Sequence, residues 1–317
     1  MTTTSLTLGI DIGGTKVLGG VVDVDGRVVA MARRETPADD VAKSLDFIIE
    51  VIEELAAGHV VNAVGVGAAG WIDATRSRVL FAPNLAWRNE PLREFIAERV
   101  SLPIVVENDA NAAAWAEFRY GAARDATESA VLVTVGTGIG SGIIAGGALV
   151  RGAHGIAAEV GHVRVVPAGR LCGCGRSGCL EQYASGTALG RYARELAEAD
   201  RAGAGHLLEL AGGSVEAITG PLVTRAARAG DPVAQAAFGR VGQWLGSGLA
   251  DLVNVLDPEV LVIGDGVIEA GELLLAPTRS AFIEALGARR TLPVAPVVAA
   301  KLGNLAGVVG AADLARR

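Results

Sequence analysis

Short apolar runs alternate along the chain with longer segments in which apolar residues recur every three or four positions. Short runs bounded by Gly, Asp or Pro are typical of strands, and longer periodic segments are typical of amphipathic helices. The pattern predicts strands at residues 6–12, 17–22, 27–32, 60–68, 103–107, 130–135, 139–145, 148–151, 260–263 and 293–299. It predicts helices at residues 38–57, 91–99, 110–119, 186–198, 232–256 and 305–315. This alternation of strands and helices indicates an α/β fold.

One arrangement of strands occurs twice. A strand, a Gly/Thr turn, a second strand, a further turn and a third strand occupy residues 6–32, and the same order returns at residues 130–151. The copies lie about 125 residues apart, a spacing that favours a duplicated domain over a solenoid repeat. Two unrelated hairpins would give the same pattern, so the duplication is a hypothesis at this point.

Composition and charge exclude several classes of protein. Of the 317 residues, 50% are apolar, which is too many for a disordered chain. No apolar run approaches the ~18–20 residues of a membrane span, and the first residues lack the pattern of a signal peptide. We therefore expect a cytoplasmic protein that does not enter a membrane. The net charge of −7 and the lack of a basic segment disfavour nucleic acid as a partner.

Two glycine-containing turns are candidates for phosphate binding. The first spans residues 11–16 (DIGGTK) and the second spans residues 136–140 (GTGIG). Glycines let backbone amides approach an anion, and Asp11 can hold a hydrated Mg²⁺ near a phosphate. The first turn lacks the P-loop spacing, and no helix follows the second, which disfavours a Rossmann site. The alternative for each is an ordinary hairpin turn, with Asp11 as a capping residue.

The segment Glu107-Asn108-Asp109 ends a predicted strand and leads into a predicted helix. Proteins of the α/β class bind ligands at the carboxyl ends of their strands, which makes Asp109 a candidate site residue. Asn108 or Asp109 can instead cap the helix.

The three cysteines of the chain fall within eight residues, as Cys172, Cys174 and Cys179, and His162 precedes them. Three thiolates and one imidazole complete a tetrahedral shell, which predicts a structural Zn²⁺ site with no open position for water. Buried free thiols are the alternative. Glu159 and Glu181 flank this irregular region. Carboxylates and an imidazole held near a metal suit a polyhydroxylated ligand such as a sugar, whereas solvent exposure is the alternative for each glutamate.

Taken together, these motifs resemble the ROK family of sugar kinases, within the hexokinase–actin ATPase superfamily. The resemblance covers nearly the whole chain and includes E-x-G-H at residues 159–162 and C-G-C-G-x-x-G-C-x-E at residues 172–181. Residues 254–258, which lead to Gly264-Asp265-Gly266, resemble the adenosine-side segment of the family. Segments 82–85 and 107–120 add a likeness to the ROK glucokinases of high-GC Gram-positive bacteria. The resemblance implies an actin-like ATPase fold with a sugar cleft between two domains. We expect a small N-terminal domain of residues 1–112 with 301–317, and a large domain of residues 113–300 that carries a zinc loop at 159–181.

The resemblance also implies residue roles. Asp109 matches the catalytic base. Segments that bind the sugar contain Gly70, Asn84, Asn108, Asp109, Glu159, His162 and Glu181. Segments that bind ATP, which enters with Mg²⁺, contain Asp11, Gly13, Gly14, Thr15, Lys16, Thr137, Gly138, Gly264, Asp265 and Gly266. His162 would serve twice, with one ring nitrogen on zinc and the other toward the sugar.

Three positions depart from the family pattern. Asp265 stands where the family usually has a glycine, so its carboxylate would either accept from ribose hydroxyls or repel phosphate. Ser141 replaces a common glycine after the second turn, and Ala69 stands where proline is frequent. The first departure bears directly on the expected nucleotide site.

The resulting hypothesis is an ATP-dependent glucokinase that phosphorylates O6 of D-glucose, with a homodimer or homotetramer as the expected assembly. The alternatives are a kinase for another hexose or an N-acetylhexosamine, a glucokinase that uses polyphosphate, and a non-catalytic ROK regulator that responds to sugar. Such regulators carry an N-terminal DNA-binding domain, and the first predicted strand here begins near Leu6. A zinc-stapled interaction module would leave the paired Gly/Thr turns unexplained.

Overall fold

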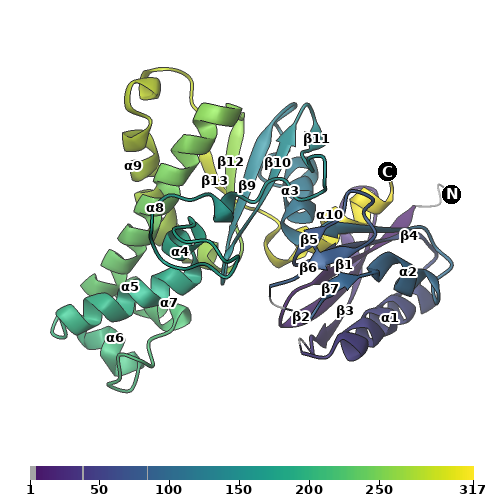
Figure 1. Ribbon diagram of the computed structural model, residues 1–317, viewed down its shortest axis with the longest axis horizontal. Helices are drawn as coiled ribbons and strands as arrows, with labels where there is room; N and C mark the ends of the chain where they lie inside the picture. The colour runs from purple at the N-terminus through teal and green to yellow at the C-terminus, as the bar shows by residue number, and fades with distance from the viewer. Residues whose placement is uncertain (1–4, 38, 84) are drawn as a thin grey trace. The chain divides into compact units, whose positions relative to one another are not determined.

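The computed structural model describes residues 5–37, 39–83 and 85–317, whose helices and strands are shown in Figure 1. Two compact units are present. The first contains the chain up to Leu132, Ser141–Glu159 and Lys301–Arg317, and the second contains Val133–Gly140 and Val160–Ala300. The boundary expected after residue 112 differs from this division, because it would cut a helix that the first unit contains whole.

A five-stranded sheet with the order β3-β2-β1-β4-β8 forms the centre of the first unit. Its strands are β1 (Leu6–Ile12), β2 (Lys16–Val22), β3 (Val28–Glu35), β4 (Val61–Ala68) and β8 (Ile104–Asn108). The first three are antiparallel neighbours, whereas β4 is parallel to β1 and β8 is parallel to β4. The carboxyl ends of β1, β4 and β8 therefore meet at one edge of the sheet.

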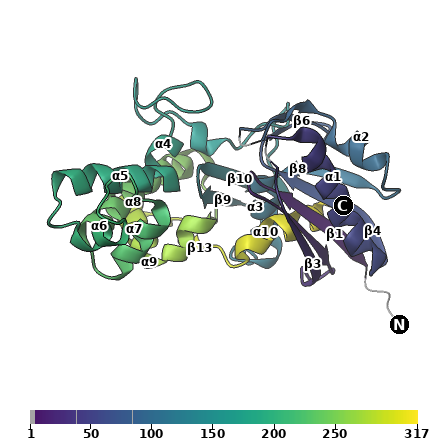
Figure 2. The same cartoon turned by 90° about the horizontal axis from the view of Figure 1, so that it is seen from below.

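Helices cover both faces of this sheet. Successive residues of a strand point to opposite faces, and an added Cβ at Gly19 would lie 2.3 Å from Val51 of α1 (Val41–Ala57). An added Cβ at Gly20 would lie 2.7 Å from Val308 of α10 (Ala306–Ala315). Helix α10 is buried along nearly its whole length. It packs against α3 (Asp109–Tyr120), and the two helices lie side by side in Figures 1 and 2.

The first unit also contains elements that the sequence pattern did not predict. A small antiparallel sheet follows β4 and consists of β5 (Trp71–Ile72), β6 (Val79–Phe81) and β7 (Arg88–Glu90). Helix α2 (Leu92–Ala97) is shorter than predicted, and α1 begins at Val41 because Asp40 caps it. The predicted first residue of α1, Ala38, lies outside the described residues.

The second sheet repeats the order of the first, as β11-β10-β9-β12-β13. Its strands are β9 (Ala130–Val135), β10 (Ile139–Ala145), β11 (Ala148–Leu149), β12 (Val260–Gly264) and β13 (Val297–Ala299). In each sheet three consecutive strands lie side by side, with the first of them in the middle of the sheet. Two strands from later in the chain lie on the other side of that first strand. The predicted duplication is confirmed by this shared order. Strand β13 is shorter than predicted because Pro293 and Pro296 lack the amide hydrogen that a ladder needs.

Helices form most of the second unit. They are α4 (Glu181–Ala184), α5 (Gly186–Ala199), α6 (Gly205–Leu210), α7 (Gly220–Arg228), α8 (Pro232–Leu256) and α9 (Glu272–Ala285). Short 3₁₀ helices lie at Val160–His162, Gly266–Ala270, Gly287–Thr291 and, in the first unit, Gly303–Leu305. Helix α8 has the predicted bounds, whereas α6, α7 and α9 were not predicted. Within the described ranges, no helix combines the length and apolar character needed to cross a membrane.

Candidate functional site

The first glycine turn joins β1 to β2 and is held closed by hydrogen bonds. The amide of Gly13 donates to the carbonyl of Lys16 over 3.0 Å, and the hydroxyl of Thr36 donates to the carbonyl of Gly13 over 2.8 Å. Gly14 and Thr15 form the tip of the turn, where Thr15 is exposed. The turn thus presents backbone at the edge of the sheet where the parallel strands end.

Asp11 lies beside this turn and against the start of α10. An added Cβ at Gly307 would lie 2.7 Å from Cγ of Asp11. Helix N-termini carry a partial positive charge, which stabilises a nearby carboxylate. Asp11 therefore lies close to the first turn of α10, and its carboxylate stands at the same sheet edge as the glycine turn.

Asn108 and Asp109 occupy the junction of β8 and α3, where only one of them caps the helix. The side chain of Asn108 caps α3 by accepting from the amide of Asn111 at 2.9 Å. Oδ1 of Asp109 accepts from the amide of Ala110 at 2.9 Å and from Nδ2 of Asn108 at 3.0 Å. Capping thus belongs to Asn108, and Asp109 is oriented by two donors at the first turn of the helix.

Gly70 is brought to the same place. Nδ2 of Asn108 also donates to the carbonyl of Gly70 over 3.0 Å. Gly70 has a φ of 151°, and an added Cβ there would lie 2.4 Å from the carbonyl oxygen of Phe81. Glu159 is half-buried and belongs to the first unit. Asn84, the remaining predicted sugar ligand of this unit, lies outside the described residues.

Glu107 is a residue of this site that sequence reasoning missed. Its side chain is buried, and its Oε1 accepts from the amide of Asn108 at 3.1 Å and from Nδ2 of Asn111 at 3.2 Å. Its Oε2 pairs with Arg151 at 2.7 Å and with Arg76 at 3.5 Å. Burial lowers the pKa of the Arg76 guanidinium, and the nearby charge of Arg151 lowers it further. One buried carboxylate therefore holds two guanidinium groups directly behind Asn108 and Asp109.

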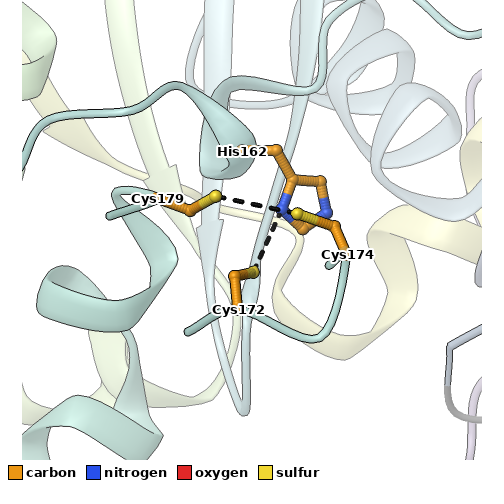
Figure 3. A group of neighbouring side chains, drawn as sticks. All are labelled: His162, Cys172, Cys174 and Cys179. Atoms are coloured by element: carbon orange, nitrogen blue, oxygen red, sulfur yellow. Dashed lines mark hydrogen bonds between the residues drawn. The ribbon is translucent and has the colours of Figure 1, made fainter. Parts of the chain in front are cut away.

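The second unit brings the four predicted metal ligands together, as Figure 3 shows. Nδ1 of His162 and the three sulfurs all lie within 4.8 Å of one another. Sγ of Cys172 is 3.6 Å from Nδ1 of His162, and Sγ of Cys174 is 3.7 Å from Sγ of Cys179. A tetrahedral zinc ion with bonds of about 2.3 Å to sulfur and about 2.0–2.1 Å to nitrogen needs ligand separations of about 3.6–3.8 Å. These two separations match those around a zinc ion, and the four residues together could hold a metal.

The chemistry of the thiols agrees with this geometry. Burial raises the pKa of the Cys172 thiol to about 12. A thiol must lose its proton to become a metal ligand, so a cation is needed to hold Cys172 as a thiolate at neutral pH. The same ion would fix the imidazole of His162 through Nδ1 and leave the proton on Nε2.

Glu181 connects the four predicted metal ligands with the second glycine turn. Its Oε1 lies 3.6 Å from Sγ of Cys172, and its Oε2 accepts from the amide of Ile139 at 3.0 Å. An added Cβ at Gly138 would lie 2.3 Å from Oε2, so glycine is required there by the close approach of the carboxylate. The start of α5 secures the turn as well, since the hydroxyl of Thr187 donates to the carbonyl of Thr137 over 2.7 Å.

A pocket of about 700 Å³ opens beside the second turn, entirely within the second unit. Its lining residues are Gly136, Thr137, Gly186, Thr187, Leu189, Gly220, Pro221, Thr224, Arg225, Arg228, Asp265, Gly266, Val267 and Glu269. Thr137, Asp265 and Gly266 were predicted to bind nucleotide, and they lie here, next to Gly264 at the end of β12. The contributions of α7, including Arg225 and Arg228, were not predicted. The volume and the mixture of apolar, cationic and hydroxyl groups suit a nucleotide.

Residues 7–317 match the family model described as the ROK family. The chain belongs to this family. Among its relatives, the glucokinase of Streptomyces coelicolor is 49% identical over 311 residues, which cover 98% of each chain. The glucokinase of Thermotoga maritima is 36% identical over 309 residues, which cover 97% of this chain and 96% of the relative.

Solved structures agree with these sequence relatives. The crystal structure of a ROK family glucokinase from Streptomyces griseus, in complex with glucose and AMPPNP, is 51% identical to this ROK protein. The two structures superpose with a TM-score of 0.91 over 98% of this chain and 99% of that chain. The expected two-domain actin-like sugar kinase fold is thereby confirmed, as is the resemblance to ROK glucokinases.

Proposed function

We propose that this ROK protein is a glucokinase that transfers the γ-phosphoryl group of ATP to O6 of D-glucose. The observation that carries the proposal is the carboxylate of Asp109, fixed by two donors at the end of a strand that is parallel in its sheet. The likeness to the S. griseus glucokinase, which was crystallised with glucose and AMPPNP, supports both substrates because it extends over 98% of the chain.

In this mechanism Asp109 accepts the proton of the sugar O6 hydroxyl while O6 attacks the γ-phosphorus. A bond forms between O6 and phosphorus, the bond to the β,γ-bridging oxygen breaks, and ADP leaves. A carboxylate is a weak base for an alcohol, so proton transfer is late and positioning supplies most of the rate. General-base assistance contributes about 10²–10⁴-fold. The hydrogen bonds of Oδ1 to Asn108 and Ala110 serve this positioning.

In this proposal the sugar is held by hydrogen bonds. Asn108 and Glu159 take part, together with the Gly70 and Asn84 segments. His162 and Glu181 supply further hydrogen-bonding groups. With Nδ1 of His162 directed at the sulfurs, Nε2 donates to a sugar hydroxyl, and the carboxylate of Glu181 accepts from another. Donors and acceptors placed in this way suit a hexose better than an apolar ligand.

Two metal ions enter the proposal with different tasks. His162, Cys172, Cys174 and Cys179 would hold zinc, which would stabilise the irregular loop that carries Glu181. Mg²⁺ would accompany ATP and supply positive charge that offsets the charge of the phosphates. Asp11 would hold the hydrated Mg²⁺ near the first turn, while Gly13, Gly14, Thr15 and Lys16 would present their backbone to the phosphates.

The proposal places the enzyme in the cytoplasm as a homodimer or homotetramer. Free thiols as zinc ligands fit a reducing compartment. The mean hydropathy of +0.40 is compatible with an apolar face buried between copies. Light scattering after gel filtration measures the assembly directly, and a monomer at micromolar concentration would contradict this part of the proposal.

The test of the reaction is a coupled assay of ADP release with glucose, mannose, N-acetylglucosamine and N-acetylmannosamine as acceptors. We expect glucose to give a kcat/KM at least tenfold above the others, with glucose 6-phosphate as product by ³¹P NMR. Asp109→Asn should still bind glucose and lose at least about a hundredfold in kcat. Asp125→Asn, which removes a carboxylate with 93% of its side chain exposed, is the matched control. Turnover of Asp109→Asn within tenfold of the wild type contradicts the role of Asp109.

A further inference from the structure

The backbone of Asp265 has a conformation that side chains rarely adopt. Asp265 follows β12, with φ 70° and ψ −173°. This region of φ and ψ is occupied almost only by glycine, because a Cβ crowds the backbone there. An aspartate at this position costs stability that a glycine would not, so its side chain calls for a functional explanation.

The carboxylate of Asp265 is held against the second glycine turn. Its Oδ1 accepts from the amide of Gly266 at 2.6 Å, which fixes the direction of the group. Its Oδ2 would lie 2.2 Å from an added Cβ at Gly136, the first residue of the turn. Asp265 is exposed, and with Gly136 and Thr137 it lines the 700 Å³ pocket. A full negative charge therefore stands where the pocket meets the turn.

A carboxylate at this place affects phosphoryl donors in opposite ways. It accepts hydrogen bonds from hydroxyl groups, and it repels the anionic oxygens of phosphate. A ribonucleoside triphosphate offers the 2′- and 3′-hydroxyls of its ribose to such an acceptor. An inorganic polyphosphate chain offers only oxygens that are anionic. The cations that line the pocket, Arg225 and Arg228, attract both donors and do not separate them.

We propose that Asp265 is a specificity-determining residue, which favours a ribonucleoside triphosphate over inorganic polyphosphate as the phosphoryl donor. Its carboxylate accepts from the ribose and excludes a bare phosphate chain from the turn. This inference takes the pocket beside the second turn as the site of the phosphoryl donor, and it rests on the proposed function in assuming that such a donor binds. It does not depend on which sugar is phosphorylated.

The test measures equilibrium binding by titration calorimetry with Mg²⁺ and without sugar. The ligands are AMPPNP, its 2′-deoxy and 3′-deoxy analogues, and tripolyphosphate. In Asp265→Gly we expect the affinity for tripolyphosphate to rise at least threefold, and the preference for AMPPNP over tripolyphosphate to fall at least tenfold. At least one deoxy analogue should bind the wild type at least fivefold more weakly than AMPPNP, and this difference should shrink below twofold in Asp265→Gly. Asp265→Asn, which removes the charge alone, should show the gain for tripolyphosphate.

Two comparisons make the result decisive. Glycine suits the backbone of position 265, so the variant should fold with a melting temperature at or above that of the wild type. Glu272→Gln removes the same charge from an exposed pair with Arg279, outside the pocket lining, and should leave every ratio within twofold. Equal losses for AMPPNP and tripolyphosphate, unchanged ratios, or a wild type that binds neither or binds both alike would overturn the proposal. A protein that shows the selectivity but does not phosphorylate glucose would overturn the proposed reaction alone.

Discussion

Replacing Glu107 by glutamine tests whether the buried charge behind Asp109 positions the site. The change keeps the shape of the side chain and a carbonyl oxygen, but it removes the negative charge that Arg76 and Arg151 share. The backbone amide of Asn108 and Nδ2 of Asn111 both donate to Oε1 of Glu107. If the NH₂ group of the glutamine took the place of Oε1, these two donors would lose their acceptor. The perturbation therefore acts on charge and on the segment that carries Asp109.

The size of the effect follows from burial. Removing one partner of a fully buried ion pair costs about 3–5 kcal/mol, because the other charge stays unpaired. The Glu107 side chain is 3% exposed, whereas those of Arg76 and Arg151 are 26% and 28% exposed, so water partly solvates the two cations that remain. We expect Glu107→Gln to lower the free energy of unfolding by about 2–3 kcal/mol. A shift of the Asn108 backbone should also lower kcat by about tenfold, since a 1 Å displacement costs up to about 10²-fold.

Urea unfolding and glucose kinetics measure the two effects. The matched control is Glu54→Gln, since Glu54 pairs with Arg34 at the same 2.7 Å but its side chain is 49% exposed. That variant should lose less than about 0.5 kcal/mol. In Glu107→Gln/Arg151→Gln the two losses should be less than additive by about 1–2 kcal/mol, as expected for charges in contact. A loss of stability no larger than in the control, or strict additivity, refutes the reasoning, and an unchanged kcat refutes the positioning role.

Three further predictions concern the metal, the pH dependence and the packing of α10. Elemental analysis of the purified protein should find about one zinc ion per chain. Cys179→Ser should lose this ion, and its melting temperature should fall by several degrees. An unchanged melting temperature after strong chelation contradicts a structural ion. Burial disfavours the charge of Asp313, but hydrogen bonds from Tyr120, Trp115 and Arg317 outweigh burial and lower its pKa below 3.8. The stability advantage over Asp313→Asn should therefore be constant above about pH 5 and shrink as the pH falls below about 4, and urea titrations that show no such decrease argue against the network. Gly9→Ala, whose Cβ would lie 1.9 Å from the carbonyl oxygen of Val308, should cost more than about 2 kcal/mol, whereas Gly58→Ala, which meets nothing within 4 Å, should be tolerated.

The fold could be predicted from the sequence wherever a periodic pattern continued over many residues. The bounds of α8 were predicted because apolar residues recur at helical spacing between Asp231 and Asp257, which cap it. The pattern failed for α9, where Pro277 interrupts the sequence although the helix continues through it. It also failed for β5–β7, whose two- and three-residue strands are too short to show alternation.

The candidate site was predictable where its residues are neighbours in the sequence. The predicted metal ligands could be recognised because His162 and Cys172, the most widely separated neighbours among them, are only ten residues apart. Glu107 was missed as a site residue because its partners, Arg76 and Arg151, lie far from it along the chain and only the fold brings them together. The division of roles between Asn108 and Asp109 was equally hidden, since either residue type caps a helix and only geometry distinguishes them.

Through Glu181, the predicted metal site affects the second glycine turn as well as its own loop. One carboxylate oxygen of Glu181 lies 3.6 Å from the sulfur of Cys172, a predicted metal ligand, and the other accepts from the amide of Ile139, which follows the Gly136–Gly138 turn. Glu181 follows Cys179, one of the predicted metal ligands, by only two residues. A loop that loses its metal should therefore also lose the placement of the carboxylate that holds this turn, and not only a proposed sugar ligand. Loss of zinc should then weaken the binding of glucose and of AMPPNP together, although the pocket proposed for the nucleotide is lined by none of the predicted metal ligands. If AMPPNP binds the chelated, still folded protein with an unchanged Kd, the link through Glu181 does not operate.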